Sequence, residues 1–256
     1  MDHSKTILIT GATSGFGLAC AEKFAGNNYQ LIITGRRKDR LDHIAADLEN
    51  RFGVEVLSLC FDVRDRAAVI DAIEKLPDEF RNIDVLVNNA GLAAGKDNFD
   101  EASLDDWDTM VDTNIKGFAY IAQSVAKLMI QNKKGHIINL GSVAAKQVYA
   151  QGNMYCATKH AVGALSEAMR IDLLPHNIKV TAIHPGAANT EFSMVRFKGD
   201  QVAADKVYEG LEPLVADDVA DAIYYCTTLP PHVCINDLVI TCTQQADAIY
   251  FSKNPG

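Results

Sequence analysis

The sequence predicts an α/β fold in which a doubly wound parallel sheet forms a single domain. Short apolar runs rich in β-branched residues recur along the chain, segments of helical periodicity lie between them, and a glycine-rich turn joins the first run to the first helical segment. Strands that alternate with helices imply right-handed crossovers and a parallel sheet covered on both faces. The expected strands are 7–10, 30–34, 54–61, 84–88, 136–140, 179–184 and 237–241.

Helices are expected where apolar residues recur every three or four positions. In segment 38–52, Leu41, Ile44, Ala45 and Leu48 fall on one stripe, which would pack against the sheet. The expected helices are 18–27, 38–52, 103–130 and 154–174.

The turn at residues 11–17 has the context of a phosphate-binding loop, because a strand precedes it and a helix follows it. Gly11 allows a sharp turn out of the strand, Gly15 lets the backbone approach a ligand, and Gly17 lets the helix pack closely on the strand. The helix N-terminus then offers amide N–H groups to a pyrophosphate. The spacing Gly-x-x-x-Gly-x-Gly differs from the Gly-x-Gly-x-x-Gly fingerprint, so a glycine turn without a ligand is the alternative.

Tyr155 and Lys159 stand four residues apart in a predicted helix, which puts both side chains on one face. A phenol has an ordinary pKa of about 10, and a nearby cation favours the phenolate, so the pair is suited to acid–base chemistry near neutral pH. The same spacing also occurs on surface helices where both residues only cover apolar surface and face water.

Ligands of parallel sheets bind at the carboxyl ends of the strands. The residues expected to meet there in one crevice are Gly11, Thr34, Asp62, Asn88, Gly141 and Pro185. Segment 187–211 follows the Pro185-Gly186 break, and its first part, 187–199, has the least periodicity in the chain. We expect it to cover the substrate, although a surface insertion fits its spacing equally well.

The composition favours one globular domain over residues 1–256 and excludes several partners. Of the 256 residues, 48% are hydrophobic and 22% charged, and the formal net charge is −9 without a basic cluster, so nucleic acid is not an expected partner. No apolar run approaches the ~18 residues of a membrane span, and no signal peptide precedes the first strand. We therefore expect a cytoplasmic protein that does not contact membranes.

Cysteines and histidines show no pattern of a metal site. The six cysteines lack a Cys-x-x-Cys pair and are expected to be reduced core residues, and the seven histidines lack metal-ligand spacing. We expect neither a bound metal nor a disulfide. His184, before Pro185, is either a lining residue of the cofactor site or, as we favour, a structural histidine with satisfied hydrogen bonds.

Five motifs occur in one order along the chain and together resemble the short-chain dehydrogenase/reductase superfamily. They are Thr10 to Gly17, Asn88-Asn89-Ala90-Gly91, Asn114, Ser142 and Tyr155-x-x-x-Lys159. The likeness spans nearly the whole chain. It implies a Rossmann-type fold, a nicotinamide cofactor, a small-molecule substrate, and assembly as a homodimer or homotetramer.

The resemblance also implies a role for each catalytic residue. Tyr155 gives a proton to the substrate carbonyl in reduction and takes one from the hydroxyl in oxidation. Lys159 holds the nicotinamide ribose and lowers the pKa of Tyr155. Ser142 hydrogen-bonds the reacting oxygen, and Asn114 positions a water that continues a proton relay from Lys159.

Cofactor choice depends on the end of the second strand, where NAD-selective sites place an acid. Gly35-Arg36-Arg37 supplies two cations there, which suits the 2′-phosphate of NADP(H), unless both are only solvated turn residues. By resemblance, Asp62 and Val63 lie by the adenine, Asn89 by the ribose, and 185–190 by the carboxamide. The expected cofactor contacts are Gly11, Thr13, Ser14, Gly15, Phe16, Gly17, Arg36, Arg37, Asp62, Val63, Asn89, Tyr155, Lys159, Pro185, Gly186, Ala188 and Thr190.

A narrower resemblance lies in 190–200, together with 35–37 and 88–93. It is to the subgroup that uses NADP to oxidise the β-hydroxyl of short 3-hydroxy acids, such as serine, allo-threonine and 3-hydroxyisobutyrate, and that includes reductases of malonic semialdehyde to 3-hydroxypropionate. Arg196 would clamp the substrate carboxylate, while Ser142 and Tyr155 hold the reacting oxygen. The chain departs from the subgroup at 184–189, where the subgroup has a Glu before Pro-Gly and one more residue after it.

Two other functions remain open. Phe192, Met194, Val195 and Phe197 would suit a reductase of a larger ketone or 3-oxoacyl thioester if they line a wide pocket rather than pack under the covering segment. A non-catalytic NADP-binding regulator on the same fold is the third hypothesis, although such proteins can dispense with the tyrosine or lysine that this chain retains.

Overall fold

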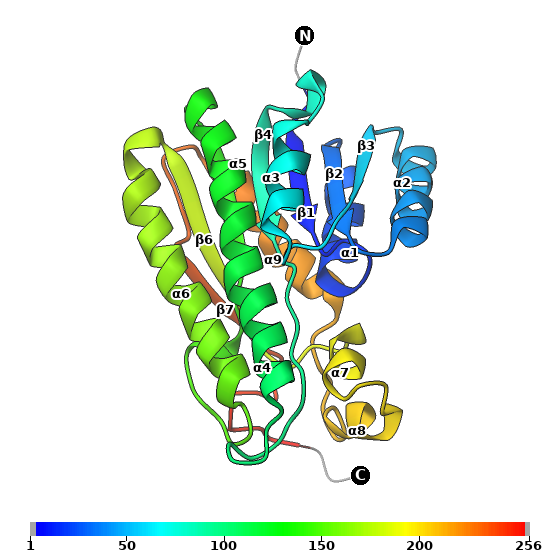
Figure 1. The fold of residues 1–256 in the computed structure, drawn as a ribbon, viewed down its shortest axis with the longest axis vertical. Coiled ribbons are helices and arrows are strands. Elements are labelled where there is room, and N and C mark those ends of the chain that lie inside the picture. The colour runs from blue at the N-terminus through cyan, green and yellow to red at the C-terminus, as the bar shows by residue number, and fades with distance from the viewer. Residues whose placement is uncertain (1–3, 254–256) are drawn as a thin grey trace.

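The computed structural model describes residues 4–253, which form a parallel sheet of seven strands with helices on both faces (Figure 1). The strand order is β3-β2-β1-β4-β5-β6-β7, so the chain starts near the middle and winds outward in both directions. The strands are β1 (Thr6–Thr10), β2 (Gln30–Gly35), β3 (Val56–Cys60), β4 (Ile83–Asn88), β5 (Gly135–Leu140), β6 (Ile178–Pro185) and β7 (Asp237–Ile240). The predicted doubly wound sheet is confirmed, and each expected strand is present.

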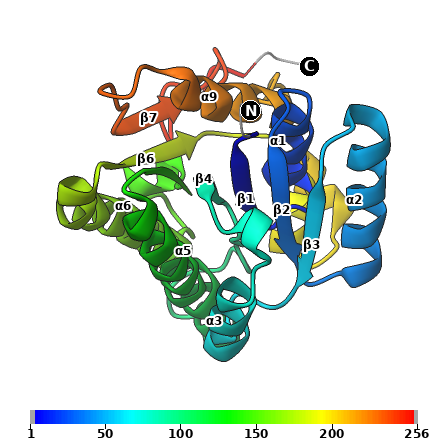
Figure 2. The ribbon, with the colours of Figure 1, turned by 90° about the horizontal axis from the view of Figure 1, so that it is seen from above.

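Helices cover both faces of the sheet, as Figure 2 shows from above. On one face lie α1 (Gly15–Ala25), α2 (Lys38–Phe52) and α9 (Ala216–Thr228). On the other face lie α3 (Arg66–Glu74), α5 (Phe118–Asn132) and α6 (Asn153–Leu173). Helix α2 has the predicted bounds, whereas α3 and α9 were not among the expected helices.

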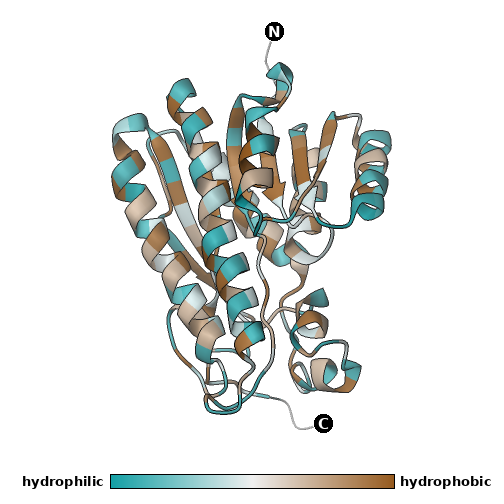
Figure 3. Ribbon diagram, viewed as in Figure 1, coloured by the Kyte–Doolittle hydropathy of each residue, from teal (hydrophilic) through white to brown (hydrophobic). Residues whose placement is uncertain are grey.

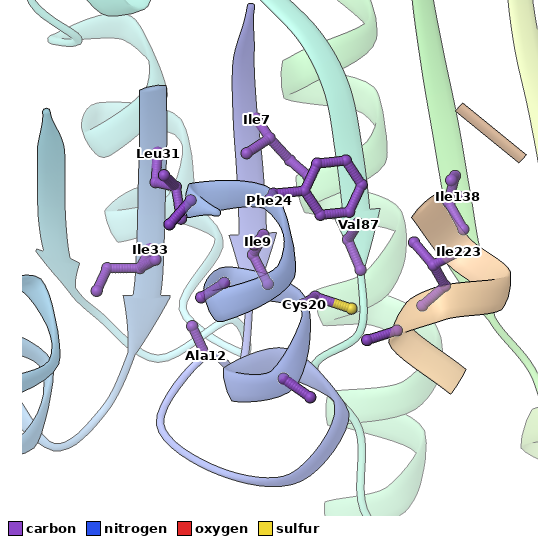
Figure 4. Packing of buried hydrophobic residues seen from close by; sticks show 14 of the residues in the cluster. Ile7, Ile9, Ala12, Cys20, Phe24, Leu31, Ile33, Val87, Ile138 and Ile223 are labelled. Atoms are coloured by element: carbon purple, nitrogen blue, oxygen red, sulfur yellow. The ribbon is translucent and has the colours of Figure 1, made fainter. Parts of the chain in front are cut away.

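The core lies between the sheet and these helices because the inner strands, β1, β2, β4, β5 and β6, are buried on both faces. Every residue of β1 is buried. Phe24 and Cys20 of α1 pack in the same buried cluster as Ile7 and Ile9 of β1 and Ile223 of α9 (Figure 4). Each such isoleucine or phenylalanine side chain contributes roughly 1.5–3 kcal/mol when removed from water. Figure 3 shows the same division, with brown strands inside and largely teal residues on α2, at the outside of the molecule.

The long helix expected over 103–130 is interrupted by a π-helical turn. It runs as α4 (Leu104–Val111), a π-helical segment (Asp112–Gly117) and then α5, and Figure 1 shows these parts as one continuous rod. Ser103 begins α4, since its Oγ accepts a hydrogen bond from the Asp106 amide at 3.3 Å. Such turns are rare and frequent at functional sites, and Asn114 lies in this one.

Segment 187–211, expected to be a covering loop, contains two short helices, α7 (Glu191–Arg196) and α8 (Gln201–Lys206). Thr190 caps α7 by accepting a hydrogen bond from the Phe192 amide at 3.2 Å, and Asp200 caps α8 by accepting one from the Ala203 amide at 3.0 Å. The segment predicted to be a loop because it lacks periodicity is therefore partly helical. Both helices lie beyond the carboxyl ends of the strands (Figure 1).

All six cysteines have free thiols, and Cys60 is exposed rather than in the core. Among residues 4–253, no helix has the length and apolar character needed to cross a membrane.

Candidate active site

A cavity of about 1280 Å³ opens at the carboxyl ends of the strands. Every predicted site residue lines it except Gly17 and Asn114. Of the strand ends expected to meet there, Gly11, Thr34, Asp62, Gly141 and Pro185 line it. Asn88 does not, because its buried side chain donates a hydrogen bond to the Phe118 carbonyl at 3.0 Å. The following Asn89 lines the cavity in its place.

The glycine turn forms one wall and presents the N-terminus of α1 to the cavity. Gly11 has φ +68°, which favours glycine, and a Cβ on Gly17 would overlap the Gly11 carbonyl. Helix and strand therefore pack as closely as the sequence predicted. Thr13 and Ser14 line the cavity just before the first turn of the helix, where the dipole and free N–H groups favour an anion.

Cations gather beside this turn. Arg37 Nη2 donates hydrogen bonds to Thr13 Oγ1 at 2.7 Å and Ser14 Oγ at 3.4 Å, so its guanidinium lies against the glycine turn. Arg36 Nη1 lies 4.0 Å from Asp62 Oδ2. Arg64 also lines the cavity and pairs with the same carboxylate at 2.7 Å, although no motif pointed to it.

The side chains of Lys159 and Asn114 approach each other next to Gly91. A Cβ on Gly91 would lie 3.2 Å from Asn114 Oδ1 and 3.7 Å from Lys159 Nζ, so the two side chains converge on one point. Asn114 is held rigidly, since its amide pairs with the main chain of Leu92 in both directions at 2.7 and 2.9 Å. Lys159 Nζ donates to the Leu140 carbonyl at 2.8 Å, and burial lowers its pKa to about 8.

Tyr155 is buried in the cavity wall, and burial raises its pKa above the ordinary value. Tyr149 adds to that rise, whereas the Ser142 hydroxyl and the Arg196 cation act in the opposite direction. Lys159 Nζ is 5.9 Å from the centre of the Tyr155 ring. Arg196 is therefore a cation that opposes the effect of burial on the Tyr155 pKa.

Ser142 follows β5 and begins a short 3-10 turn, Val143–Ala145. Its Oγ accepts a hydrogen bond from the Ala144 amide at 3.1 Å, which fixes the hydroxyl on the Tyr155 side of the turn. A hydroxyl so fixed is well placed to donate to an oxygen that Tyr155 also reaches.

Arg196, at the end of α7, closes the site above Tyr155. Its Nε donates to the Gly95 carbonyl at 3.3 Å and its Nη1 to the Tyr149 hydroxyl at 3.2 Å. Its Nη2 is buried and has no hydrogen-bond partner within the described part of the chain. Lys96 and Lys253 line the same region; burial lowers the pKa of Lys96, and Arg196 and Lys253 lower it further. This region can hold an anion.

Tyr149, Lys96 and Lys253 had no motif in the sequence. They come from a loop after the 3-10 turn, a loop after β4 and the C-terminal segment, and only the fold brings them together. Within residues 4–253, no three His, Cys, Asp or Glu side chains are grouped as metal ligands.

Comparison with known proteins agrees with this geometry. The family model described as short chain dehydrogenase matches residues 5–201. The chain belongs to this family. Its parallel sheet, glycine turn and Tyr155–Lys159 pair are thus those of an oxidoreductase.

Individual relatives are similar over almost their whole length. An NADP-dependent 3-hydroxy acid dehydrogenase of Salmonella typhi is 46% identical over 231 residues, 90% of this chain and 92% of the relative. A serine 3-dehydrogenase of Agrobacterium fabrum is 44% identical over 245 residues, and a sulfoacetaldehyde reductase of Chromohalobacter salexigens is 45% identical over 244 residues; each match covers 96% of the relative, and 96% and 95% of this chain respectively. The closed form of a serine dehydrogenase with NADP+ superposes with a TM-score of 0.90 at 42% identity, covering 98% of this chain and 100% of that one.

Proposed function

We propose that this protein transfers a hydride between NADP and the 3-position of a short 3-hydroxy acid, such as serine, allo-threonine, 3-hydroxyisobutyrate or 3-hydroxypropionate. One observation carries the choice of an acidic substrate. Arg196 has a buried, unpartnered Nη2 among residues 4–253, and its guanidinium carbon lies 5.6 Å from the centre of the Tyr155 ring. An anionic head bound there would put a reacting oxygen within reach of Tyr155 and Ser142.

The residues around the cavity fit NADP. Arg36 and Arg37 stand where an NAD-selective site has an acid, and the N-terminus of α1 beside them suits a pyrophosphate. In this proposal Asp62 and Val63 lie by the adenine and Asn89 by the ribose. Pro185, Gly186, Ala188 and Thr190 flank the carboxamide. Similarity to NADP-dependent relatives supports this cofactor.

When bound, NADPH would supply the hydride for reduction and NADP+ would accept it in oxidation, and residues of the chain control the proton and the oxygen. Tyr155 gives its phenol proton to the carbonyl oxygen in reduction and takes the hydroxyl proton in oxidation, while Ser142 donates a hydrogen bond to that oxygen. Lys159, whose lowered pKa lets it exchange a proton near neutral pH, restores the proton with Asn114 beside it. Arg196 fixes the acid group and favours the phenolate.

A short sulfonate is the second candidate substrate. Lys96 and Lys253 stand with Arg196 at the substrate end, and a sulfonate offers three oxygens to such a group of cations. The similarity to a sulfoacetaldehyde reductase supports the same candidate.

The test follows absorbance of NADPH. The purified protein is assayed with NADP and the four acids, and with NADPH and malonic semialdehyde, sulfoacetaldehyde or an acetoacetyl thioester. We expect turnover with a 3-hydroxy acid, and a Tyr155→Phe variant that keeps its fold and NADPH affinity should lose nearly all of it. Turnover of the thioester alone would favour the larger-ketone hypothesis. No turnover with NADPH binding intact would favour the non-catalytic regulator.

We also propose a cytoplasmic homodimer or homotetramer. Exposed Leu104, Ile171 and Leu174 lie on or beside α4 and α6, and we propose that these helices pair across a two-fold axis. Free thiols suit a reducing compartment. Light scattering of the purified protein tests the assembly, and cell fractionation tests the location.

A further inference from the structure

His184 connects the loop that carries Ser142 to strand β7. The imidazole is fully buried. Its Nδ1 lies 3.3 Å from the Ser142 amide nitrogen and 3.1 Å from the Ser142 carbonyl oxygen. On the other side of the ring, Nε2 lies 3.2 Å from Asp237 Oδ2. Gly141 makes room for this arrangement, because a Cβ there would overlap the ring.

Asp237 also holds the far end of the same loop. The loop starts at Ser142, makes the turn Val143–Ala145 and ends at Lys146, whose Nζ lies 2.7 Å from Asp237 Oδ2. Partial burial alone would raise the pKa of Asp237, but Lys146 and His184 bring it below its ordinary value. One ionised carboxylate therefore fastens both ends of the loop, the first through His184 and the second directly.

The charge on Asp237 determines the tautomer of His184. Burial lowers the pKa of His184; Asp237 opposes this effect and Lys146 adds to it, so the ring is neutral at neutral pH. A carboxylate only accepts hydrogen bonds, and we therefore assign the single ring proton to Nε2. Nδ1 is then left as an acceptor for the Ser142 N–H at 3.3 Å, and its 3.1 Å contact with the Ser142 carbonyl oxygen is not a hydrogen bond in this tautomer.

We propose that His184, with Asp237 fixing its tautomer, is a positioning residue that holds Ser142 so that its hydroxyl faces Tyr155. The Ser142 Oγ accepts a hydrogen bond from the Ala144 amide of the same loop at 3.1 Å, so its position follows that of the loop. His184 acts through the Ser142 main chain. This inference rests on the proposed roles of Ser142 and Tyr155 in catalysis.

Two substitutions separate the contacts of His184. His184→Asn keeps an acceptor near Nδ1 for the Ser142 amide, whereas His184→Gln keeps a donor near Nε2 for Asp237 and loses that acceptor. With NADP and 3-hydroxyisobutyrate, the Gln variant should lower kcat about tenfold or more at nearly constant KM, and the Asn variant should stay within about threefold of wild type. His232→Gln, at an exposed histidine outside the cavity, is the control.

A Ser142→Ala background distinguishes positioning from general stability. If His184 and Asp237 act through the serine hydroxyl, neither His184→Gln nor Asp237→Asn should lower kcat further in that background. Asp237 is partly exposed, so its variant should fold even if the histidine variants do not. If each substitution lowers kcat by the same factor in the wild-type and the Ser142→Ala backgrounds, the inference is overturned.

Crystal structures of the two histidine variants give a readout independent of turnover. Ser142 Oγ should move away from Tyr155 in the Gln variant and keep its place in the Asn variant. An unmoved Ser142 in the Gln variant would overturn the inference. A wild-type protein without turnover on any probe would contradict the proposed function, and the crystal structures would still decide the role of His184.

Discussion

The guanidinium carbon of Arg196 lies 5.6 Å from the centre of the Tyr155 ring. The residue that would bind an acidic substrate is therefore also a cation acting on the phenol that would move the proton, and it lowers the Tyr155 pKa against the effect of burial. Binding of the acid group and proton transfer are thus linked through one side chain.

Arg196→Gln should raise KM for 3-hydroxy acids about 10- to 100-fold, because a hydrogen bond between charged groups contributes about 1.5–3 kcal/mol. Tyr155 must be protonated to reduce a carbonyl, and loss of the cation raises its pKa, so the alkaline limit of reduction should move to higher pH. Steady-state kinetics that extend above pH 10, into the range of the raised Tyr155 pKa, measure both effects. Lys198→Gln, at an exposed residue that pairs with Asp106 outside the cavity, should change neither.

Replacing Arg36 and Arg37 together by alanine should raise KM for NADPH about 100-fold or more and leave KM for NADH within about threefold. Two guanidinium contacts to a 2′-phosphate would be lost, and NADH carries no such group. Arg51→Ala is the matched control, since Arg51 lies on α2 away from the cavity and pairs with Glu22 and Asp47. An equal rise in KM for NADPH and for NADH would contradict a binding site for the 2′-phosphate.

The sheet was predictable because buried parallel strands are continuous apolar runs, such as Thr6–Thr10. Helix α9 carries Val219, Ile223 and Cys226 at helical spacing, so its signal was present in the sequence but not used. Helix α3 is short and buries only two residues, Val69 and Ile73, which is too weak a stripe to recognise.

The site was predictable where chemistry follows local spacing and not where it depends on tertiary contacts. Spacing put Tyr155 and Lys159 on one face of α6, but it did not reveal that the end of β5 would offer the Leu140 carbonyl to the lysine. Tyr149 and Lys253 lie far from the motifs in sequence and join the cavity only after folding. His184 was favoured as a structural histidine, and its link to Ser142 depends on strand neighbours.

His136 should make the protein sensitive to acid. It lies in β5, its Nε2 is 2.7 Å from Thr181 Oγ1, and burial, with Lys179, lowers its pKa from 6.5 to about 3. At pH values between about 3 and 6.5, His136 is protonated in the unfolded chain and neutral in the folded protein. The free energy of unfolding therefore decreases as the pH falls below 6.5. His136→Gln does not titrate and should lose less stability between pH 7 and 4.5, by on the order of 2–3 kcal/mol. Urea unfolding at both pH values measures this, and equal losses in variant and wild type would contradict it.

Lys159 should lower the free energy of unfolding at neutral pH, because its ammonium group is then charged and buried. Its pKa falls from 10.5 to about 8 on burial, so between pH 8 and 10.5 the unfolded chain holds a proton that the folded chain has released. Wild-type stability should therefore rise across this interval relative to Lys159→Met, by on the order of 3 kcal/mol in total.

The comparison of Lys159→Met with wild type removes the shared titration of other groups, which includes the exposed lysines. Urea unfolding at pH 7.5 and 10 gives the free energy of each protein. A constant difference between the two proteins would mean that Lys159 keeps its ordinary pKa, and then it would have no advantage as a proton donor near neutral pH. A rising wild-type advantage would show that the energy of burying this cation is used to bring its pKa into the range where the proposed proton relay operates.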